Sequence, residues 1–255
     1  MLEPILDSVR SRLGPIVAAE PQWRELAAAA APARDFRAAL RAPGLSVIAE
    51  IKRRSPSVGA IDEHLDPSLR AAAYEAGGAA ALSVLTEPDH FGGSLDDLET
   101  ARAAVGLPVL RKDFVLHSAQ IWQARAHGAD AILLIVAALS DRDLTELLET
   151  AEEAGVAALV EAHTASEARR AASAGASIIG VNNRDLTSFT VDLATAEGLR
   201  GELPAEAVTV AESGVSNPAG AARMAAAGYD AVLVGEALVR ASDPADLVRR
   251  LRGAP

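Results

Sequence analysis

Eight short runs of aliphatic and β-branched residues recur along this chain of 255 residues, and a segment with helical periodicity follows each one. The runs begin roughly 20 to 34 residues apart, which is the spacing of strand–helix units. They occupy residues 46–52, 80–86, 108–114, 130–136, 156–162, 177–183, 207–213 and 230–236. A glycine precedes several runs at the expected end of a helix, as at Gly128 and Gly228. This alternation is typical of an α/β fold with a parallel sheet.

Two architectures share this alternation, a closed (β/α)8 barrel and a doubly wound open sheet. The phosphate loops G-x-G-x-x-G and G-x-x-x-x-G-K-[ST], which are the usual signals of the open sheet, are missing from the expected places in the sequence. No linker-like tract rich in glycine, serine or proline divides the chain. We therefore predict an α/β fold with one (β/α)8 TIM barrel domain over 1–255, in which 46–255 form the barrel and 1–45 an N-terminal helical extension.

Two helices are expected in the extension. Apolar residues recur at helical spacing through 2–13, and Gly14-Pro15 predicts the end of this first helix. The alanine-rich stretch 21–40 predicts a second helix, whose Phe36 is expected to contact the core.

Composition narrows the class of protein. The formal net charge of -11 argues against a nucleic-acid partner or an anionic membrane surface, and no run approaches the ~18 apolar residues of a membrane span. The chain has no cysteine, which excludes disulfides, thiolate metal sites and a thiol nucleophile. A cytoplasmic location is the expectation.

Lysine is rare in this chain. Of 24 lysines and arginines only two are lysines, Lys52 and Lys112. Arginine stays protonated in proteins, whereas the pKa of a lysine moves with its surroundings. We therefore expect the two lysines to stand where a proton is transferred.

Charged and polar residues gather at the C-terminal ends of the predicted strands, the end of a barrel where active sites lie. They are Glu50, Lys52, Lys112, Asp113, Glu161, Asn182, Asn183, Arg184, Glu212 and Ser213. Alternate residues of a strand share a face, so Glu50 and Lys52 are expected to point together into the barrel mouth. A buried Glu50 would then have cationic neighbours, which it needs to stay charged.

Each of these groups also has a purely structural alternative. Glu50–Lys52 and Lys112–Asp113 would then be ordinary ion pairs, and Glu161 would cap the next helix or pair with an arginine. Adjacent asparagines are common in turns. Three arginines near the strand ends are expected to be solvated, namely Arg53, Arg54 and Arg111. These alternatives do not predict that all the groups lie at one end of the barrel.

Two ligand types can be considered at this end. Glu161 and His163 share a strand face, which suggests a metal, but a second close pair of ligands is lacking, so no metal site is predicted. Gly214 and Gly235 follow the last two strands, where this fold commonly binds phosphate at loop and helix N–H groups. The alternative is that both glycines only allow tight turns.

The segments VIAEIKRRSPSVG, SVLTEPDHFGGSLDDL, PVLRKDF, GADAILLIVAAL, LVEAH, IIGVNNRDL, VAESGVS and AVLVGEALVR occur in this order. Together they resemble the indole-3-glycerol phosphate synthase family over 46–240, and the helical extension is similar too. The resemblance implies a cofactor-free ring closure in tryptophan biosynthesis. In that reaction 1-(2-carboxyphenylamino)-1-deoxyribulose 5-phosphate, a small phosphosugar–anthranilate substrate, loses carbon dioxide and water. With no nucleic-acid or membrane partner expected from the charge, the expected partner is this small molecule alone. The chain is expected to be a monomer, with a weak homodimer as the alternative.

The resemblance assigns catalytic roles to residues of the strand ends. Lys112 is expected to be the general acid on the substrate carbonyl, and Glu161 the base that also stabilises an iminium-like cation. Lys52 is expected to bind the substrate carboxylate and to be the candidate acid for dehydration. Crowding at a semi-enclosed site is expected to lower the pKa of both lysines. The other expected catalytic residues are Glu50, Asn182, Glu212 and Ser213.

The resemblance also assigns residues that bind the substrate. Arg184 is expected to assist the carboxylate, and an apolar slot for the ring is expected from Pro56, Phe91, Phe114, Leu133 and Leu186. Phosphate binding is expected from Ser55, Ser213, Gly214, Gly235 and the backbone N–H of Glu236, whose side chain would turn away. His117 and Ala119 depart from the residues that the family often carries after strand 3.

Three other functions compete with this expectation. A neighbouring phosphosugar isomerase of the same pathway typically uses a cysteine, and the chain has none. A Schiff-base aldolase would form an imine on Lys52 or Lys112. A phosphosugar-binding barrel without catalysis would have lost these lysines, and both are present.

Overall fold

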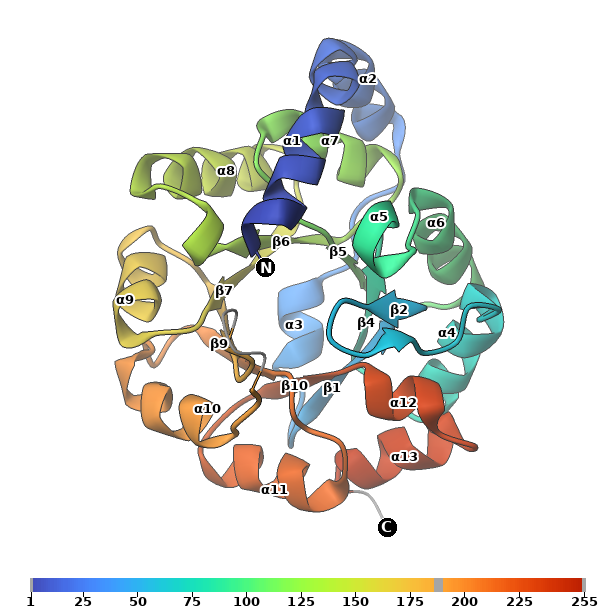
Figure 1. Ribbon diagram of the computed structural model, residues 1–255, viewed down its shortest axis with the longest axis vertical. Coiled ribbons are helices and arrows are strands. Elements are labelled where there is room, and N and C mark those ends of the chain that lie inside the picture. Colours follow the sequence, from blue (N-terminus) through green and yellow to red (C-terminus); the bar gives the residue numbers. More distant parts are fainter. Residues whose placement is uncertain (1, 186–189, 254–255) are drawn as a thin grey trace.

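A computed structural model of the chain describes residues 2–185 and 190–253. Eight parallel strands close into a barrel in the order β1-β10-β9-β8-β7-β6-β5-β4 (Figure 1). Their bounds are β1 Ser46–Ile51, β4 Ala81–Leu85, β5 Val109–Lys112, β6 Ala131–Ile135, β7 Ala157–Ala162, β8 Ile178–Asn182, β9 Val208–Glu212 and β10 Ala231–Val234. Each strand lies within one of the eight apolar runs, so the predicted (β/α)8 barrel is confirmed.

Helices surround the barrel and cover the outer face of its sheet (Figure 1). The main ones are α4 Pro67–Ala76, α6 Leu95–Ala104, α7 Ser118–Ala126, α8 Asp141–Glu153, α9 Ala165–Ser173, α10 Ala194–Leu199, α11 Pro218–Ala226 and α13 Pro244–Leu251. At several helix starts a polar side chain accepts a hydrogen bond from a free backbone N–H group, as Ser140 does for α8 and Thr164 for α9. None of the helices in the described part of the chain is long and apolar enough to cross a membrane.

Shorter elements lie at the strand ends, and the sequence did not predict them. They are the hairpin β2 Arg54–Ser55 with β3 Gly59–Ala60, the helices α5 Pro88–Phe91 and α12 Glu236–Arg240, and the 3-10 turns η1 Val136–Ala138 and η2 Arg200–Glu202. The hairpin is antiparallel and follows β1 directly. It places the Ser-Pro-Ser turn beside the barrel mouth (Figure 1).

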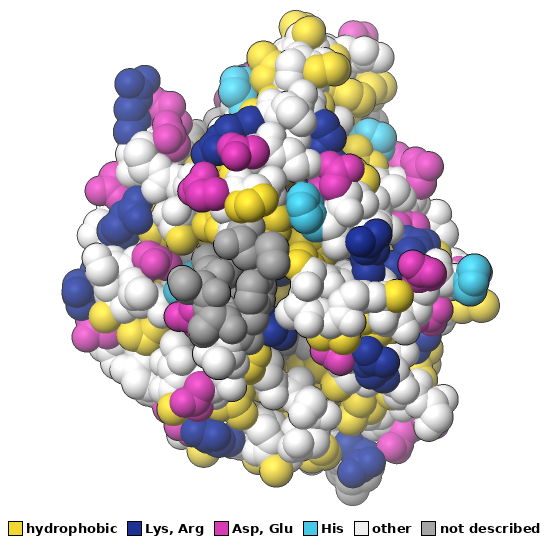
Figure 2. Space-filling view, in the orientation of Figure 1, with side chains coloured by type: hydrophobic (Ala, Val, Ile, Leu, Met, Phe, Trp, Pro, Cys, Tyr) yellow, Lys and Arg dark blue, Asp and Glu magenta, His cyan; other side chains and the backbone are white. Residues whose placement is uncertain are grey.

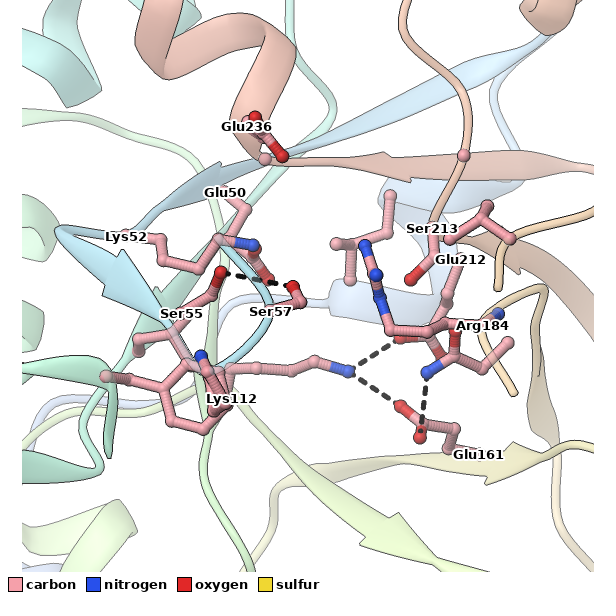
Figure 3. A pocket seen from close by; sticks show the side chains of 18 of the residues that line it. Glu50, Lys52, Ser55, Ser57, Lys112, Glu161, Arg184, Glu212, Ser213 and Glu236 are labelled. Carbon is pink, nitrogen blue, oxygen red and sulfur yellow. Dashed lines mark hydrogen bonds and ion pairs between the residues drawn. The ribbon is translucent and has the colours of Figure 1, made fainter. Parts of the chain in front are cut away.

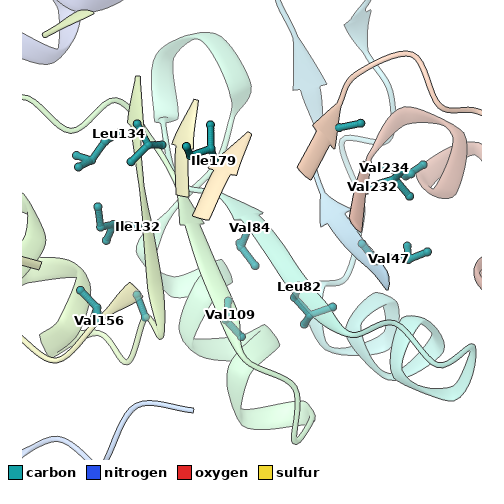
Figure 4. Close-up of a cluster of buried hydrophobic side chains, with 14 of the residues drawn as sticks. Val47, Leu82, Val84, Val109, Ile132, Leu134, Val156, Ile179, Val232 and Val234 are labelled. Carbon is teal, nitrogen blue, oxygen red and sulfur yellow. The ribbon is translucent and has the colours of Figure 1, made fainter. Parts of the chain in front are cut away.

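The core has two layers that follow the alternation of side chains along each strand. On β1, Val47 and Ala49 face outward into the layer between strands and helices, part of which is seen in Figure 4. Ile48 faces inward with Leu110 and Leu159 of other strands and fills the barrel interior. Because one residue of shift reverses the two faces, this alternation also decides which charged residues face the mouth.

The N-terminal helix is longer than the sequence predicted. Helix α1 spans Leu2–Ala18 and continues through Gly14-Pro15. Proline has no backbone N–H, so the carbonyl of Ser11 receives no hydrogen bond from position 15. Pro15 is exposed, and this carbonyl therefore lies on the solvent side of the helix. The prediction that this helix ends at Gly14-Pro15 is therefore wrong.

The second predicted helix is divided. Helix α2 spans Glu20–Ala29, and a short helix α3 spans Phe36–Leu40. Pro32 disfavours a helical conformation at the residue before it, and the side chain of Asp35 caps the restart by accepting from the N–H of Ala38. Phe36 and Leu40 are buried among the inward residues of the strands, so α3 plugs the end of the barrel opposite the mouth (Figure 1).

Replacing Phe36 by alanine tests this plug. The side chain is 1% exposed, and its loss would leave a cavity in the barrel interior. We expect Phe36→Ala to lower the free energy of unfolding by about 3 to 5 kcal/mol in urea titrations. Leu69→Ala on α4, where the residue is 71% exposed, is the control and should change it by less than ~0.5 kcal/mol. A loss below about 1 kcal/mol at Phe36 would contradict a packed plug.

Candidate active site

The C-terminal ends of the strands surround a cavity of about 700 Å³. The face seen in Figure 2 is hollowed near its centre, and a basic side chain is visible inside the hollow. Every residue that was expected to have a catalytic or binding role lines this cavity, except Leu186, which lies outside the described residues. The barrel therefore brings together groups that are spread over more than 180 residues of sequence, from Glu50 to Glu236.

Lys112 stands at the centre of the charged floor of the cavity (Figure 3). Its ammonium donates to Glu161 Oε2 at 2.8 Å and to Glu212 Oε2 at 2.6 Å. These side chains come from β5, β7 and β9; both carboxylates are buried, and the lysine side chain is 14% exposed. The structural alternative of a Lys112–Asp113 pair is wrong, because adjacent strand residues face opposite sides of the sheet.

The pKa of Lys112 moves in the direction opposite to the expected one. Burial alone lowers it, but the charges of Glu161, Glu212 and Glu50 outweigh burial and raise the pKa above its usual value. Crowding with other cations would have lowered it, whereas the structure surrounds this lysine with carboxylates. Lys112 is therefore protonated in the unliganded protein.

The two carboxyl groups on Lys112 differ in their protonation. Burial raises the pKa of Glu161, but Lys112, His163 and the amide of Asn182 overcome this and bring it down to about 2. Burial raises the pKa of Glu212 to about 7, because Lys112 compensates only in part and the charge of Glu161 adds to the rise. Near neutral pH the pair thus shares one ionised and one partly protonated carboxyl.

The absence of a side chain at Gly180 leaves room for the carboxylate of Glu212. In the sheet register this residue of β8 lies opposite Glu161 on one side and opposite Val210, two residues before Glu212, on the other. A Cβ atom at this position would lie 2.1 Å from Glu212 Oε1. The sequence analysis did not identify Gly180, although a glycine inside a β-branched strand is a signal of close approach.

Glu50 and Lys52 form a second ion pair in the cavity (Figure 3). Lys52 Nζ donates to Glu50 Oε1 at 2.7 Å, and Ser83 Oγ donates to Glu50 Oε2 at 3.3 Å. Ser83 on β4 is fully buried and was not predicted to take part in the site. The pair lies against the backbone of Gly235, where a Cβ atom would be 2.4 Å from Glu50 Oε1.

Two of the three arginines expected in solvent are held inside the protein. Arg111 is 4% exposed and donates to Asp113 Oδ2 at 2.9 Å and to Thr86 Oγ1 at 3.1 Å behind the barrel wall. Arg53 donates to both carboxylate oxygens of Asp97. Arg54 is exposed. The expectation failed for Arg111 because β5 is covered by helices, so its outward residues are buried.

The adjacent asparagines have separate tasks. Asn182 Nδ2 donates to Glu161 Oε1 at 3.1 Å on the cavity side. Asn183 points away from the cavity, where its Nδ2 donates to the carbonyl of Glu212 at 3.0 Å and its Oδ1 accepts from the N–H of Ala196. The turn alternative thus describes Asn183, while Asn182 holds Glu161.

One wall of the cavity is apolar. Phe91 and Phe114 face each other with ring centroids 6.2 Å apart, and Pro56 and Leu133 line the same wall. The first turns of α1 add apolar residues that the sequence analysis had not placed in the site, namely Leu2 and Ile5. Together these residues suit a flat aromatic ring.

The loops after β9 and β10 form the other end of the cavity. Ser213 has φ of 62°, and it is the only non-glycine residue in the described ranges with a positive φ. Gly214 follows with φ of 86°. Strained backbone of this kind concentrates at functional sites. The Glu236 carboxylate accepts from Arg240 at 3.0 Å, which leaves the start of α12 facing the cavity.

His117, which departs from the family pattern, is the N-cap residue of α7. Its Nδ1 accepts from the N–H of Ala119 at 3.1 Å, and Gln120 Oε1 accepts from the N–H of His117 at the same distance. This reciprocal pair is a capping box built with histidine. The loop after β5 is therefore packed in a defined way.

Comparisons with known proteins agree with this geometry. A family model described as indole-3-glycerol phosphate synthase matches residues 2–251. The relative named indole-3-glycerol phosphate synthase 1 of Streptomyces coelicolor is 52% identical over 256 residues, covering 100% of this chain and 95% of that protein. Indole-3-glycerol phosphate synthases of Micrococcus luteus and Mycobacteroides abscessus are 52% and 53% identical, covering 100% and 97% of this chain and 97% and 93% of theirs.

A more distant likeness concerns the fold alone. The structure of thiamine phosphate pyrophosphorylase from Pyrococcus furiosus superposes with a TM-score of 0.62 at 18% identity, covering 84% of this chain and 96% of that one. The matches to the synthases span the extension, the barrel and all the strand ends that form the cavity. The chain belongs to the indole-3-glycerol phosphate synthase family.

Proposed function

We propose that the cavity closes the indole ring of 1-(2-carboxyphenylamino)-1-deoxyribulose 5-phosphate and releases indole-3-glycerol phosphate, carbon dioxide and water. Membership of the family makes the chain a carboxy-lyase of tryptophan biosynthesis that acts on a small molecule. The observation that carries the assignment of residues is the position of Lys112 between two buried carboxylates, beside an apolar wall. An ammonium group and a carboxylate are thus available within one enclosed space.

Ring closure uses Lys112 as the general acid. The ring carbon that bears the carboxylate attacks the ribulose carbonyl carbon, and the ammonium of Lys112 gives its proton to the carbonyl oxygen. The new alkoxide is far more basic than a carboxylate, so an ammonium with a raised pKa still protonates it. The positive charge left on the ring nitrogen is stabilised by the carboxylate of Glu161, which Asn182 and Lys112 hold in place.

Decarboxylation and dehydration complete the reaction. The bond to the carboxylate breaks, carbon dioxide leaves, and the bond electrons neutralise the ring nitrogen. Lys52, held by Glu50, first binds the substrate carboxylate and then protonates the leaving hydroxyl, which departs as water. Glu161 takes a proton from the neighbouring methylene carbon, and the indole double bond forms.

The rest of the cavity positions the substrate. Phe91, Phe114, Pro56 and Leu133 enclose the anthranilate ring, and Arg184 assists its carboxylate. The phosphate is held by the N–H groups of the loops after β9 and β10 together with hydroxyls, through Ser55, Ser213, Gly214, Gly235 and the backbone of Glu236. Leu186 remains a proposed wall residue outside the described ranges. No cofactor or metal enters this scheme.

We also infer that 1–255 form a single domain that acts as a monomer in the cytoplasm, with a weak homodimer as the alternative. One chain supplies both lysines, the carboxylates and the apolar wall, so catalysis needs no second copy. The extension closes the cavity with Leu2 and Ile5 and contacts the barrel through α1 and α3.

Substitutions of Lys112 test the general acid. We expect Lys112→Met to lower kcat by at least ~10²-fold while KM stays within about tenfold, because the proton donor is lost but the binding surfaces remain. Lys112→Arg should be nearly as damaging, since a guanidinium is a poor proton donor. Turnover is followed by indole fluorescence, with exposed Arg142→Met on α8 as the control. Unimpaired turnover in either lysine variant would rule out this role.

The pH dependence of stability tests the proton held by Glu212. Its folded-state pKa is raised from 4.5 to about 7, so the folded protein binds this proton more tightly than the unfolded chain does. The native protein should therefore lose stability relative to the Glu212→Gln variant as the pH rises. The difference between their free energies of unfolding should fall by roughly 1 to 3 kcal/mol from about pH 5 to about pH 8. Urea titrations at both values measure it. A pH-independent difference would show that Glu212 is ionised throughout.

A further inference from the structure

His163 lies directly behind the carboxylate of Glu161. It does not line the substrate cavity, and its side chain is 10% exposed. Its Nε2 is 3.3 Å from Glu161 Oε1, and its Nδ1 is 3.2 Å from Glu167 Oε2. The imidazole ring is thus placed between a carboxylate of the active site and a carboxylate of helix α9.

The surroundings of His163 favour its charged form. Burial alone lowers the pKa of the imidazole, but the hydrogen bond with Glu167 and the charge of Glu161 outweigh burial and raise it. Glu212 on β9 adds a more distant negative charge. Glu167 is itself held, because its Oε2 accepts the backbone N–H of His163 at 2.8 Å.

Cations also lie near this group of carboxylates. Lys112 on β5 reaches the far side of Glu161, and Arg184 after β8 lines the same cavity. Both belong to the substrate site, whereas His163 approaches Glu161 from outside it and Glu167 contacts His163. His163 therefore interacts with Glu161 without itself lining the cavity.

The partners of the two catalytic carboxyl groups are unequal. Glu161 accepts hydrogen bonds from Lys112 and Asn182, and it lies within ion-pair distance of His163 Nε2, which has no hydrogen-bond partner among the described residues. Glu212 is contacted by Lys112 at Oε2, while its buried Oε1 has no hydrogen-bond partner among the described residues. A proton shared by these two carboxyl groups is therefore favoured on Glu212, because Glu212 has fewer hydrogen-bond donors and fewer cations around it than Glu161.

We propose that His163, oriented by Glu167, is a positioning residue that keeps Glu161 ionised and thereby assigns the shared proton to Glu212. In its protonated form the imidazole places a positive charge on one side of the pair and none on the other. This proposal deepens the proposed function and rests on the role of Glu161 as the base. Glu161 and Glu212 have the same side chain and the same lysine partner. The contact with His163 would make their protonation, and so their roles in the reaction, different.

Carboxyl titration in the resting enzyme tests the proposal without using activity. In protein labelled with ¹³C at glutamate carboxyls, His163→Gln should raise the apparent pKa of Glu161 by at least about one unit and lower that of Glu212. Glu161→Gln and Glu212→Gln assign the two signals. Glu167→Gln should lower the pKa of the His163 imidazole and shift both carboxyls in the same directions by less. Glu167→Gln changes only the carboxylate that contacts the outer side of the imidazole. It therefore still tests the proposal if His163→Gln folds poorly.

Kinetics of the same variants provide the second measurement. His163→Gln should lower kcat by about tenfold while KM changes less than about threefold, because the base weakens and the binding surfaces remain. His127→Gln is the matched control, since His127 also pairs with a glutamate, Glu99 at 2.7 Å, on the outer surface. It should leave the carboxyl titration and kcat unchanged.

The two proposals fail separately. Unchanged carboxyl pKa values in both His163→Gln and Glu167→Gln would overturn the positioning role and leave the role of Glu161 intact. Full turnover of Glu161→Gln would instead overturn Glu161 as the base, whatever the titrations show.

Discussion

The ion triad of Lys112, Glu161 and Glu212 is the interaction around which this active site is organised. Moving an ion out of water costs several kcal/mol, and here two carboxylates share one lysine at the floor of a cavity. The triad is therefore short of one positive charge. Asn182 and His163 stabilise Glu161, and Glu212 responds by taking up a proton near pH 7. The result is an asymmetric pair, with one carboxyl ionised and the other partly protonated near neutral pH.

The barrel makes this arrangement through the two-residue period of its strands. Inward positions low in the barrel carry Ile48, Leu110 and Leu159, and the same face carries Glu50, Lys112 and Glu161 two residues later. An aliphatic layer thus lies directly beneath the charges. It excludes water from below, which strengthens the electrostatic interactions above it. Packing and catalysis therefore depend on one register.

Elements outside the barrel complete the site. Helix α1 brings Leu2 and Ile5 to the cavity and is anchored by Arg12, which donates to the fully buried Glu87 at 2.8 Å. The hairpin after β1 brings Ser55 and Pro56 to the cavity. These contacts connect the helical extension to the chemistry, since they shape the space in which the aromatic ring is proposed to bind.

The sequence by itself determined the eight strands, their inward faces and the convergence of the two lysines, because strand period and barrel geometry are local and regular. Tertiary structure decided the rest. Proximity across strands set the pKa directions of Lys112 and Glu212, the contact of Ser83 with Glu50 and the space at Gly180. The burial of Arg111 depended on which helix covers its strand, and helix α1 continued past Pro15 because that residue faces solvent. None of these facts is contained in spacing along the chain, since each is a relation between segments that only folding brings together.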